Sequence, residues 1–296
     1  MYSYYTTSYN GRTIHIVKAL ADSNHDIQLS LLAYKYDTAD PIKLASDFGD
    51  GYLESNGWAK VATINAGIFN APYANGIEVS QWNIHENDDS SLDAVIGIGH
   101  DGSTNSALTI ATQATLKSVI GSFRGAVTGA FGLIKDGADF QGNTSIQGAY
   151  SSLSGRSIVA RGWDGALYFI ATPGVTGSSG LTGAQCLDLV KNVLGLKDAV
   201  AMDGGGSVSL IYEGSWKVST TRQIKNVFCI YAKQKSEQGG GGEDPAVVSN
   251  YDQFIPLFDL ADLPHQIRVN GIMSPIKDIQ VKMSNGLVSI LDLDNI

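Results

Sequence analysis

Most of the first 234 residues form short segments in which apolar and polar positions alternate or apolar residues run together. Residues 12–20 (RTIHIVKAL) and 26–36 (DIQLSLLAYKY) alternate, which is typical of strands with one buried face. Residues 60–69 (KVATINAGIF) are more continuously apolar, as in a strand buried on both faces. Segments of the same kind follow at 93–103, 165–174 and 226–233. Because these strands do not alternate strictly with helices, we expect an α+β or mixed α/β fold with mixed β-sheets and few helices.

Two segments have the periodicity of amphipathic helices. In residues 181–195, Thr182 and Gln185 are spaced as a capping box, and Gly195 is placed to end the helix in the left-handed conformation. The second predicted helix covers residues 112–123. The expected buried stripes are Leu187, Val190 and Leu194 in the first helix, and Leu116, Val119, Ile120 and Phe123 in the second.

The composition indicates a folded chain that does not bind polyanions. Of the 296 residues, 43% are hydrophobic, which is enough for a substantial core, and the 34 glycines against 7 prolines suggest many tight turns. The net charge is −9 and no basic run occurs, so nucleic acid and anionic membranes are not expected partners. A single locally positive site can still bind a small anion. The two cysteines, Cys186 and Cys229, fit no zinc pattern and are expected to be reduced core residues.

Targeting signals are not apparent in the sequence. No run of 18 apolar residues occurs, so no membrane span is expected. The first twenty residues lack the basic and apolar regions of a signal peptide. The sequence therefore leaves two locations open, a phage particle and the cytoplasm of the producing cell.

The segment KQKSEQGGGGEDPAVV contains the clearest boundary in the chain. Its composition predicts a flexible linker over 235–244 between a main domain, 1–234, and a small, mostly β accessory domain, 245–296. The tail has strand-like pieces at 266–271, 277–283 and 287–293. So short a segment buries little core, so we expect it to serve a homo-oligomer or virion assembly and to carry no catalysis.

Residues 199–214 (AVAMDGGGSVSLIYEG) place one carboxylate and four small residues between two predicted strands. Asp203 follows an apolar run, and Gly204, Gly205, Gly206 and Ser207 come next. A β-hairpin with a glycine-rich turn explains this spacing, but a hairpin needs fewer glycines. The alternative is a ligand site in which the carboxylate performs acid–base work and the loop amides bind an oxyanion. In that case at least one of the glycines should have a positive φ and line a polar cleft.

Separated segments of the chain resemble one family in the same order. They are TINAGIF at residues 63–69, GRSIVARG at 155–162, DGGGS at 203–207 and RQIKNVFCIYA at 222–232. The chain resembles the phosphodiester glycosidase family over about residues 60–232, although Ala66 stands where that family commonly has glycine. The residues that carry the resemblance are Asn65, Gly67, Phe69, Arg156, Ser157, Asp203, Gly204, Gly205, Gly206, Ser207 and Arg222.

The resemblance implies a hydrolase that cleaves the sugar C1–O bond of glycosyl-1-phosphodiesters, such as N-acetylglucosamine-1-phosphate diesters, in a glycan or surface polymer. Phosphate is a good leaving group, so the site must chiefly bind its charge and activate water or a nucleophile at the anomeric carbon. Asp203 and Arg156 are then the expected catalytic residues. The expected substrate- or phosphate-binding residues are Gly204, Gly205, Gly206, Ser207, Asn65 and Arg222.

Several alternatives stay open at this point. Asp203 could act as a base, a nucleophile or a metal ligand, so a divalent cation is not excluded, and Asp136 is a weaker candidate. A non-catalytic phage structural or glycan-binding protein could share the scaffold. Hydrolysis of an ordinary glycosidic bond would require a second carboxylate close to Asp203.

Two further patterns are better explained as ordinary loops than as ligand sites. GIGHDG, residues 97–102, matches G-x-G-x-x-G, but the strand-like residues after it predict a hairpin turn instead of a nucleotide site. Residues 85–93 (HENDDSSLD) carry oxygen ligands for calcium without the EF-hand spacing, and a solvated acidic loop is expected there.

Overall fold

The chain forms two compact units, Met1–Ser236 and Glu237–Ile296. The computed structural model describes residues 1–35, 38, 41–87, 94–98, 108–140, 147–235, 266–269, 272–275, 278–283 and 286–292. The division between the units falls inside the glycine-rich segment 235–244.

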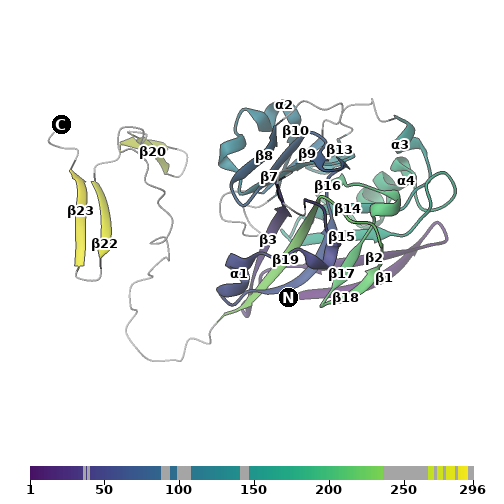
Figure 1. The fold of residues 1–296 in the computed structure, drawn as a ribbon, viewed down its shortest axis with the longest axis horizontal. Coiled ribbons are helices and arrows are strands. Elements are labelled where there is room, and N and C mark those ends of the chain that lie inside the picture. The colour runs from purple at the N-terminus through teal and green to yellow at the C-terminus, as the bar shows by residue number, and fades with distance from the viewer. Residues whose placement is uncertain are drawn as a thin grey trace. The chain divides into compact units, whose positions relative to one another are not determined.

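Three sheets make up most of the first unit (Figure 1). The seven-stranded sheet has the order β1 (Tyr2–Tyr9), β2 (Arg12–Ala19), β15 (Leu167–Thr172), β14 (Arg156–Arg161), β16 (Asp198–Ala201), β12 (Phe131–Lys135), β13 (Ala138–Asp139). One five-stranded sheet has the order β18 (Ser215–Val218), β17 (Leu210–Tyr212), β4 (Ala59–Asn65), β19 (Asn226–Gln234), β3 (His25–Ala33). The other has the order β10 (Leu108–Thr112), β9 (Ala94–Ile98), β11 (Gly125–Thr128), β7 (Ile77–Ser80), β8 (Asn83–Asn87). A small hairpin joins β5 (Phe69–Asn70) to β6 (Tyr73–Ala74).

The expectation of a β-rich fold with few helices is confirmed, but the expectation of mixed sheets is wrong. Every strand pair in the described part of the chain is antiparallel. Parallel neighbours need long crossover connections, usually helices, and the helices here are too short and few to supply them. The α-helices are α1 (Gly51–Ser55), α2 (Gln113–Lys117), α3 (Gln147–Ser151) and α4 (Gly183–Asp188).

The predicted helices begin where expected and end differently. α4 has the capping box of Thr182 and Gln185, and Gly195 has a φ of 61° as predicted. A π-helical turn, Leu189–Val193, continues α4. Val190 is buried as predicted, Leu187 and Leu194 are partly buried against the core, and Leu189 is buried in addition. The other helix, α2, ends at Lys117 and is followed by a 3₁₀ turn at Ile120–Ser122, which leaves Val119 exposed.

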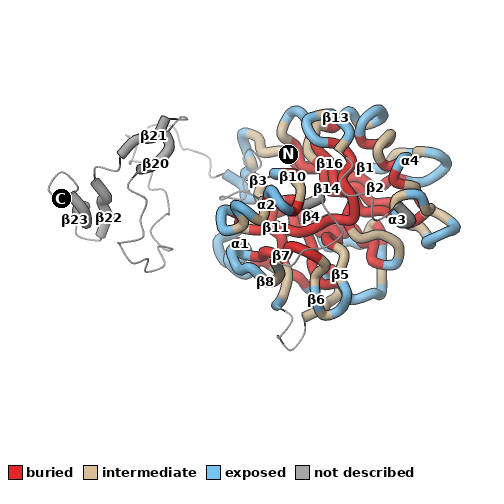
Figure 2. The backbone as a smooth tube through the Cα atoms, turned by 90° about the horizontal axis from the view of Figure 1, so that it is seen from above, coloured by how far each residue is buried: buried red, intermediate tan, exposed pale blue. Residues whose placement is uncertain are grey.

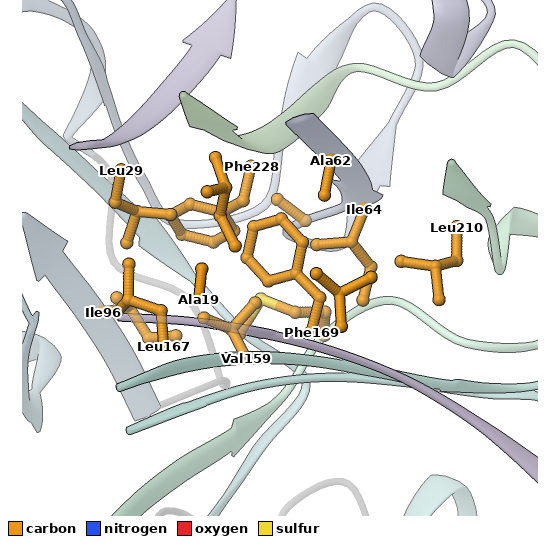
Figure 3. Packing of buried hydrophobic residues seen from close by; sticks show 14 of the residues in the cluster. Ala19, Leu29, Ala62, Ile64, Ile96, Val159, Leu167, Phe169, Leu210 and Phe228 are labelled. Atoms are coloured by element: carbon orange, nitrogen blue, oxygen red, sulfur yellow. The ribbon is translucent and has the colours of Figure 1, made fainter. Parts of the chain in front are cut away.

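The main core lies between the inner faces of the sheets. Ala19, Val159 and Phe169 come from the seven-stranded sheet, and Ile64 and Phe228 from the five-stranded sheet that contains β4 (Figure 3). The buried strands β14, β16 and β4 run through the middle of this unit (Figure 2). Each sheet therefore presents its outer residues to solvent or to a short covering segment, while its inner residues fix the positions of the neighbouring sheets.

In the second unit the described residues are all strands. β20 (Gln266–Val269) pairs with β21 (Ile272–Pro275), and β22 (Asp278–Met283) pairs with β23 (Gly286–Asp292). Three of these strands coincide with the strand-like pieces of the sequence, and β21 was not anticipated. No helix among the described residues of the chain is long and apolar enough to cross a membrane.

Candidate active site

The loop after β16 connects two different sheets. β16 lies in the seven-stranded sheet, whereas β17, which begins at Leu210, pairs with β4 and β18 in a five-stranded sheet. The hairpin interpretation of residues 199–214 is therefore wrong. Gly205 has a φ of 59°, and a Cβ there would lie 2.7 Å from Thr176 Oγ1. At Gly204 a Cβ would lie 2.7 Å from the Gly155 carbonyl oxygen, so the loop can take this path only with small residues.

A cleft of about 580 Å³ borders this loop. Among the described lining residues Arg222 is the only charged one, and the hydroxyl-bearing residues next to it form one wall. Gly205 combines a positive φ with a place in this lining, so the conformational part of the expectation for the loop is met. The lining residues are Pro173, Gly174, Gly205, Gly206, Val208, Val218, Ser219, Thr220, Thr221 and Arg222.

Asp203 occupies the start of the loop with its side chain half-buried. Its backbone N–H donates to the Ala66 carbonyl oxygen at 2.8 Å. Burial raises the pKa of the carboxyl above its ordinary value, because the charged form loses hydration. The Ser207 hydroxyl, the Arg222 charge and the Gly204 amide act in the opposite direction and favour the ionised form. The net effect is a raised pKa, a perturbation that is frequent at functional sites.

Arg222 supplies positive charge at the rim of the cleft. Its side chain is exposed, and the guanidinium lies 5.1 Å from the ring centre of Phe69 in a cation–π contact. Among the described residues Arg222 forms no ion pair, although its charge reaches Asp203 strongly enough to favour the ionised carboxylate. The planar group is therefore available for an anionic ligand.

Asn65, at the end of β4, forms hydrogen bonds that fix the position of the Asp203 loop. Its Nδ2 donates to the Asp203 carbonyl oxygen at 2.7 Å. Its Oδ1 accepts from Ser157 Oγ on β14 at 2.5 Å and from the Ser209 N–H at 3.0 Å. The side chain is 1% exposed. This geometry favours a positioning role for Asn65 over direct substrate contact, and its substrate-binding role stays a prediction.

Arg156, at the start of β14, is buried beneath the same loop. Nε donates to the Leu181 carbonyl oxygen at 2.8 Å, and Nη2 donates to the Ala149 and Ser152 carbonyl oxygens at 2.7 and 2.6 Å. A Cβ on Gly204 would lie 3.7 Å from Nη1, so the guanidinium is next to the loop. Desolvation lowers the pKa of Arg156 from its ordinary value. The backbone contacts favour a role in shaping the loop, and direct participation in catalysis stays a prediction.

The loop amides are used unequally. The Gly205 N–H donates to the Gly155 carbonyl oxygen at 3.0 Å, and the Ser207 N–H donates to the Gly204 carbonyl oxygen at 3.2 Å. The Gly206 N–H has no backbone acceptor within the described residues, and Gly206 faces the cleft. Ser207 Oγ is buried without a hydrogen bond of ordinary geometry there. Ser207 is buried, does not line the cleft, and acts through its hydroxyl on the Asp203 carboxylate. Of the loop groups expected to bind phosphate, the Gly206 N–H is therefore the one that remains available at the cleft.

Other predicted residues lie away from this site. Asp136 lies in the turn between β12 and β13, with Oδ1 3.3 Å from Lys197 Nζ and its N–H bonded to Asp198, at the opposite end of β16 from Asp203. Both cysteines are free and buried, and burial raises each thiol pKa to about 12. The described residues contain no cluster of three His, Cys, Asp or Glu side chains that could hold a metal ion.

The segments 97–102 and 85–93, which were expected to be ordinary loops, lie partly outside the described residues. Around GIGHDG, β9 and β10 pair antiparallel, as a hairpin requires, while the connecting residues 99–107 are outside the described part of the chain. In the acidic segment, His85 Nδ1 lies 3.3 Å from Glu78 Oε1. Residues 88–93, which carry Asp88, Asp89 and Asp93, are not described, so the calcium alternative stays untested.

Thr220 is a site residue that the sequence analysis missed. Its Oγ1 donates to the Gly206 carbonyl oxygen at 2.6 Å and accepts from the Arg222 N–H at 3.0 Å. It belongs to the hydroxyl-rich run immediately before Arg222. That run was the available signal, but only the fold shows that it faces the glycine loop.

The sequence profile of the phosphodiester glycosidase family matches residues 59–231. The chain belongs to the phosphodiester glycosidase family. The match covers the range on which the motif resemblance was based, so the resemblance is confirmed. No curated protein sequence matches the chain significantly.

Solved structures share the fold of this phosphodiester glycosidase family member. The zebrafish N-acetylglucosamine-1-phosphodiester α-N-acetylglucosaminidase catalytic domain, auto-inhibited by its pro-peptide, matches with a TM-score of 0.57 and 18% identity. That match covers 78% of this chain and 82% of the zebrafish chain. A hypothetical protein from Synechocystis matches with a TM-score of 0.54 and 12% identity, covering 78% of this chain and 62% of its own. At these identities the structures show the common fold alone.

Proposed function

We propose that this protein hydrolyses sugar-1-phosphodiesters at the bond between the anomeric carbon and the phosphate oxygen. The observation that carries the proposal is the half-buried Asp203 carboxylate, which begins a glycine loop. The loop borders a cleft in which Arg222 is the only charged residue of the described lining. Family membership supports the reaction class. The name of the zebrafish protein with the same fold states action on an N-acetylglucosamine-1-phosphodiester, which suggests that sugar for this chain as well.

In the proposed reaction Asp203 is the general base. It accepts a proton from water as the water oxygen bonds to C1, the C1–O bond breaks, and the phosphomonoester leaves with the bonding electron pair. A carboxyl whose pKa is raised by burial is a stronger base than an ordinary aspartate, provided it is still ionised at the working pH. Arg222 and the Gly206 N–H stabilise the negative charge that develops on the departing phosphate.

A lone carboxylate suits this reaction better than the cleavage of an ordinary glycosidic bond. Ordinary glycosides usually require a second carboxylic acid to protonate the leaving oxygen, about 5 to 10 Å from the first. Within the described part of the chain, the groups that act on the Asp203 pKa are Ser207, Arg222 and Gly204, and no carboxylate is among them. A phosphate leaving group needs no such acid, so the paired-carboxylate alternative is less well supported.

The proposed substrate is a glycan or surface polymer that carries sugar-1-phosphodiester links. One cation in the cleft suits the single negative charge of a phosphodiester, and the hydroxyls of the adjacent wall suit a sugar. A non-catalytic glycan-binding protein could use the same wall. Such a binder has no need for a carboxylate whose pKa is raised beside the anion-binding groups.

Hydrolysis in ¹⁸O-labelled water tests the proposal. The probe is methyl N-acetylglucosamine-1-phosphate, and mass spectrometry of the products locates the label. Cleavage at C1–O places ¹⁸O in the free sugar, whereas phosphodiesterase chemistry at phosphorus places it in the phosphate. Binding of the probe without turnover would support the non-catalytic alternative. NMR of the first sugar anomer formed separates a general base, which inverts the configuration, from a nucleophile, which retains it.

A further inference from the structure

Thr220 links the two parts of the site that carry the anion-binding groups. Its hydroxyl donates to the carbonyl oxygen of Gly206 at 2.6 Å, in the loop that begins with Asp203. The Thr220 hydroxyl oxygen also accepts a hydrogen bond from the backbone N–H of Arg222 at 3.0 Å. The Thr220 side chain therefore joins the segment after β18 to the segment after β16. The strands β16 and β18 belong to different sheets.

We propose that Thr220 is a positioning residue that fixes the separation between Arg222 and the glycine loop, so that the cation and the Gly206 N–H bind one phosphate together. The expected effect of Thr220 on hydrolysis rests on the proposed function, while its expected effect on the Asp203 pKa does not. Thr220 is half-buried and touches the loop through its hydroxyl, so it acts through Arg222 and Gly206 and not on the substrate bond.

The need for such a tether follows from the exposure of Arg222. An exposed arginine has many rotamers, and ordering it for one ligand costs conformational entropy. The stacking on Phe69 restrains the guanidinium, but only Thr220 fastens the Arg222 backbone to the loop among the described contacts. Without the hydroxyl, Arg222 and the loop would move independently.

Titration of Asp203 measures this coupling without any substrate. Arg222 favours the ionised carboxylate, so loosening Arg222 should raise the Asp203 pKa further. The other charged group next to the loop, Arg156 on β14, is held by three backbone carbonyls and is not released by a change at Thr220. The Ser207 hydroxyl and the Gly204 amide also act on the carboxylate and stay in place.

The experiment compares Thr220→Val, which removes the hydroxyl, with Thr220→Ser, which keeps it. Thr6→Val, at an exposed position on β1, is the control for the same substitution elsewhere. ¹³C NMR of labelled aspartate should show a higher Asp203 pKa in Thr220→Val and the wild-type value in Thr220→Ser and Thr6→Val. In an Arg222→Gln background, Thr220→Val should cause no additional rise, because the charge that it positions is gone.

Binding of N-acetylglucosamine-1-phosphate and hydrolysis of the methyl diester provide the second readout. Thr220→Val should weaken binding and lower kcat/KM about tenfold, the size expected from losing one or two ordinary hydrogen bonds, mainly through KM. Wild-type pKa and binding in a folded Thr220→Val or Thr220→Ala protein would overturn the inference. If the wild type neither binds nor hydrolyses these probes, the proposed function fails, and the Asp203 titration alone decides the role of Thr220.

Discussion

The two ends of β16 carry carboxylates in opposite situations. At its first residue, Asp198 is 3% exposed, its Oδ2 accepts from Arg161 Nη2 at 2.6 Å and Nε at 3.0 Å, and its Oδ1 accepts the Asp136 N–H. Just beyond the last residue, Asp203 is half-buried beside a cleft and forms no ion pair among the described residues. The first carboxylate is paired with an arginine inside the fold, whereas the second has no ion-pair partner among the described residues, and we propose that it acts on a ligand.

The comparison distinguishes a carboxylate that stabilises the fold from a carboxylate that we propose as the catalytic base. Both residues flank the same buried strand, so burial of the backbone does not distinguish them. The difference lies in their partners: Asp198 has a bidentate guanidinium, whereas the nearest cation to act on Asp203 is an exposed arginine. We therefore expect substitutions at the two ends to affect different properties.

The largest expected effect is the loss of activity in Asp203→Asn. The substitution keeps the shape of the side chain and removes the base, so kcat should fall about 10²- to 10⁴-fold. Rates of sugar release from the methyl diester measure this change, and the circular dichroism spectrum should match that of the wild type. Activity within about tenfold of wild type would show that Asp203 is not the base.

The matched substitution at the other end, Asp198→Asn, should act on stability instead. Removing one partner of a buried ion pair leaves Arg161 uncompensated, which costs about 3 kcal/mol. Urea denaturation measures the free energy of unfolding. Sugar release per folded molecule should stay close to wild type, and a large fall in activity would mean that the two ends are coupled.

Alanine substitutions within the glycine loop should have smaller effects on the free energy of unfolding, and these effects should differ between Gly205 and Gly206. Gly205→Ala should reduce the free energy of unfolding by about 1 to 2 kcal/mol, because Ala is strained at a φ of 59° and its Cβ would meet Thr176 Oγ1. Gly206 has open space around its Cα, so Gly206→Ala should change stability by less than about 0.5 kcal/mol. Equal losses in the two variants, measured by urea denaturation, would contradict the described loop conformation.

The pH dependence of stability should also distinguish Asp203. Burial raises the Asp203 pKa in the folded protein, so folding favours the protonated carboxyl. The free energy of unfolding therefore falls as the pH rises from the pKa of the unfolded chain through that of the folded protein. Asparagine does not ionise, so Asp203→Asn should gain stability relative to wild type as the pH rises above about 4. Unfolding free energies at a series of pH values test this, and a constant difference would argue against a raised pKa.

The smallest expected effect on activity comes from deleting residues 243–296. The first unit contains every residue of the candidate site, so hydrolysis per site should stay the same. Oligomeric state or surface binding should change if the tail serves assembly, and light scattering can detect the former. An inactive truncated protein that is folded and monodisperse would show that the tail completes the site.

Local patterns predicted most strands and the start of α4, because alternation and capping depend on neighbouring residues. The capping box of Thr182 and Gln185 is an example. The π-helical turn after Asp188 was not predictable, since tertiary packing overrides the helical period there. The Asp203 loop was recognised as a candidate site, but its path between sheets depends on the pairing of Leu210 with Ile64, which no local pattern specifies.

The roles of the two arginines were harder to separate from the sequence. The resemblance alone assigns Arg156 to catalysis and Arg222 to phosphate binding. Their difference arises from backbone carbonyls of residues 149, 152 and 181, which the fold brings to Arg156, and from the exposure of Arg222. Motifs therefore indicated the candidate site, while the different contacts of its residues depended on segments that are distant in the sequence.

The hydrogen bonds of Asn65 also determine at which stage of folding the candidate site can form. They join residues separated by 138, 92 and 144 positions in the chain, so they belong to the slow, non-local part of folding. A nascent chain still lacking Ser209 cannot close this network, and a proteolytic cut between Asn65 and Asp203 divides it between two fragments. We therefore expect activity to appear late in refolding, together with the docking of the sheets, and not with the earlier formation of local hairpins.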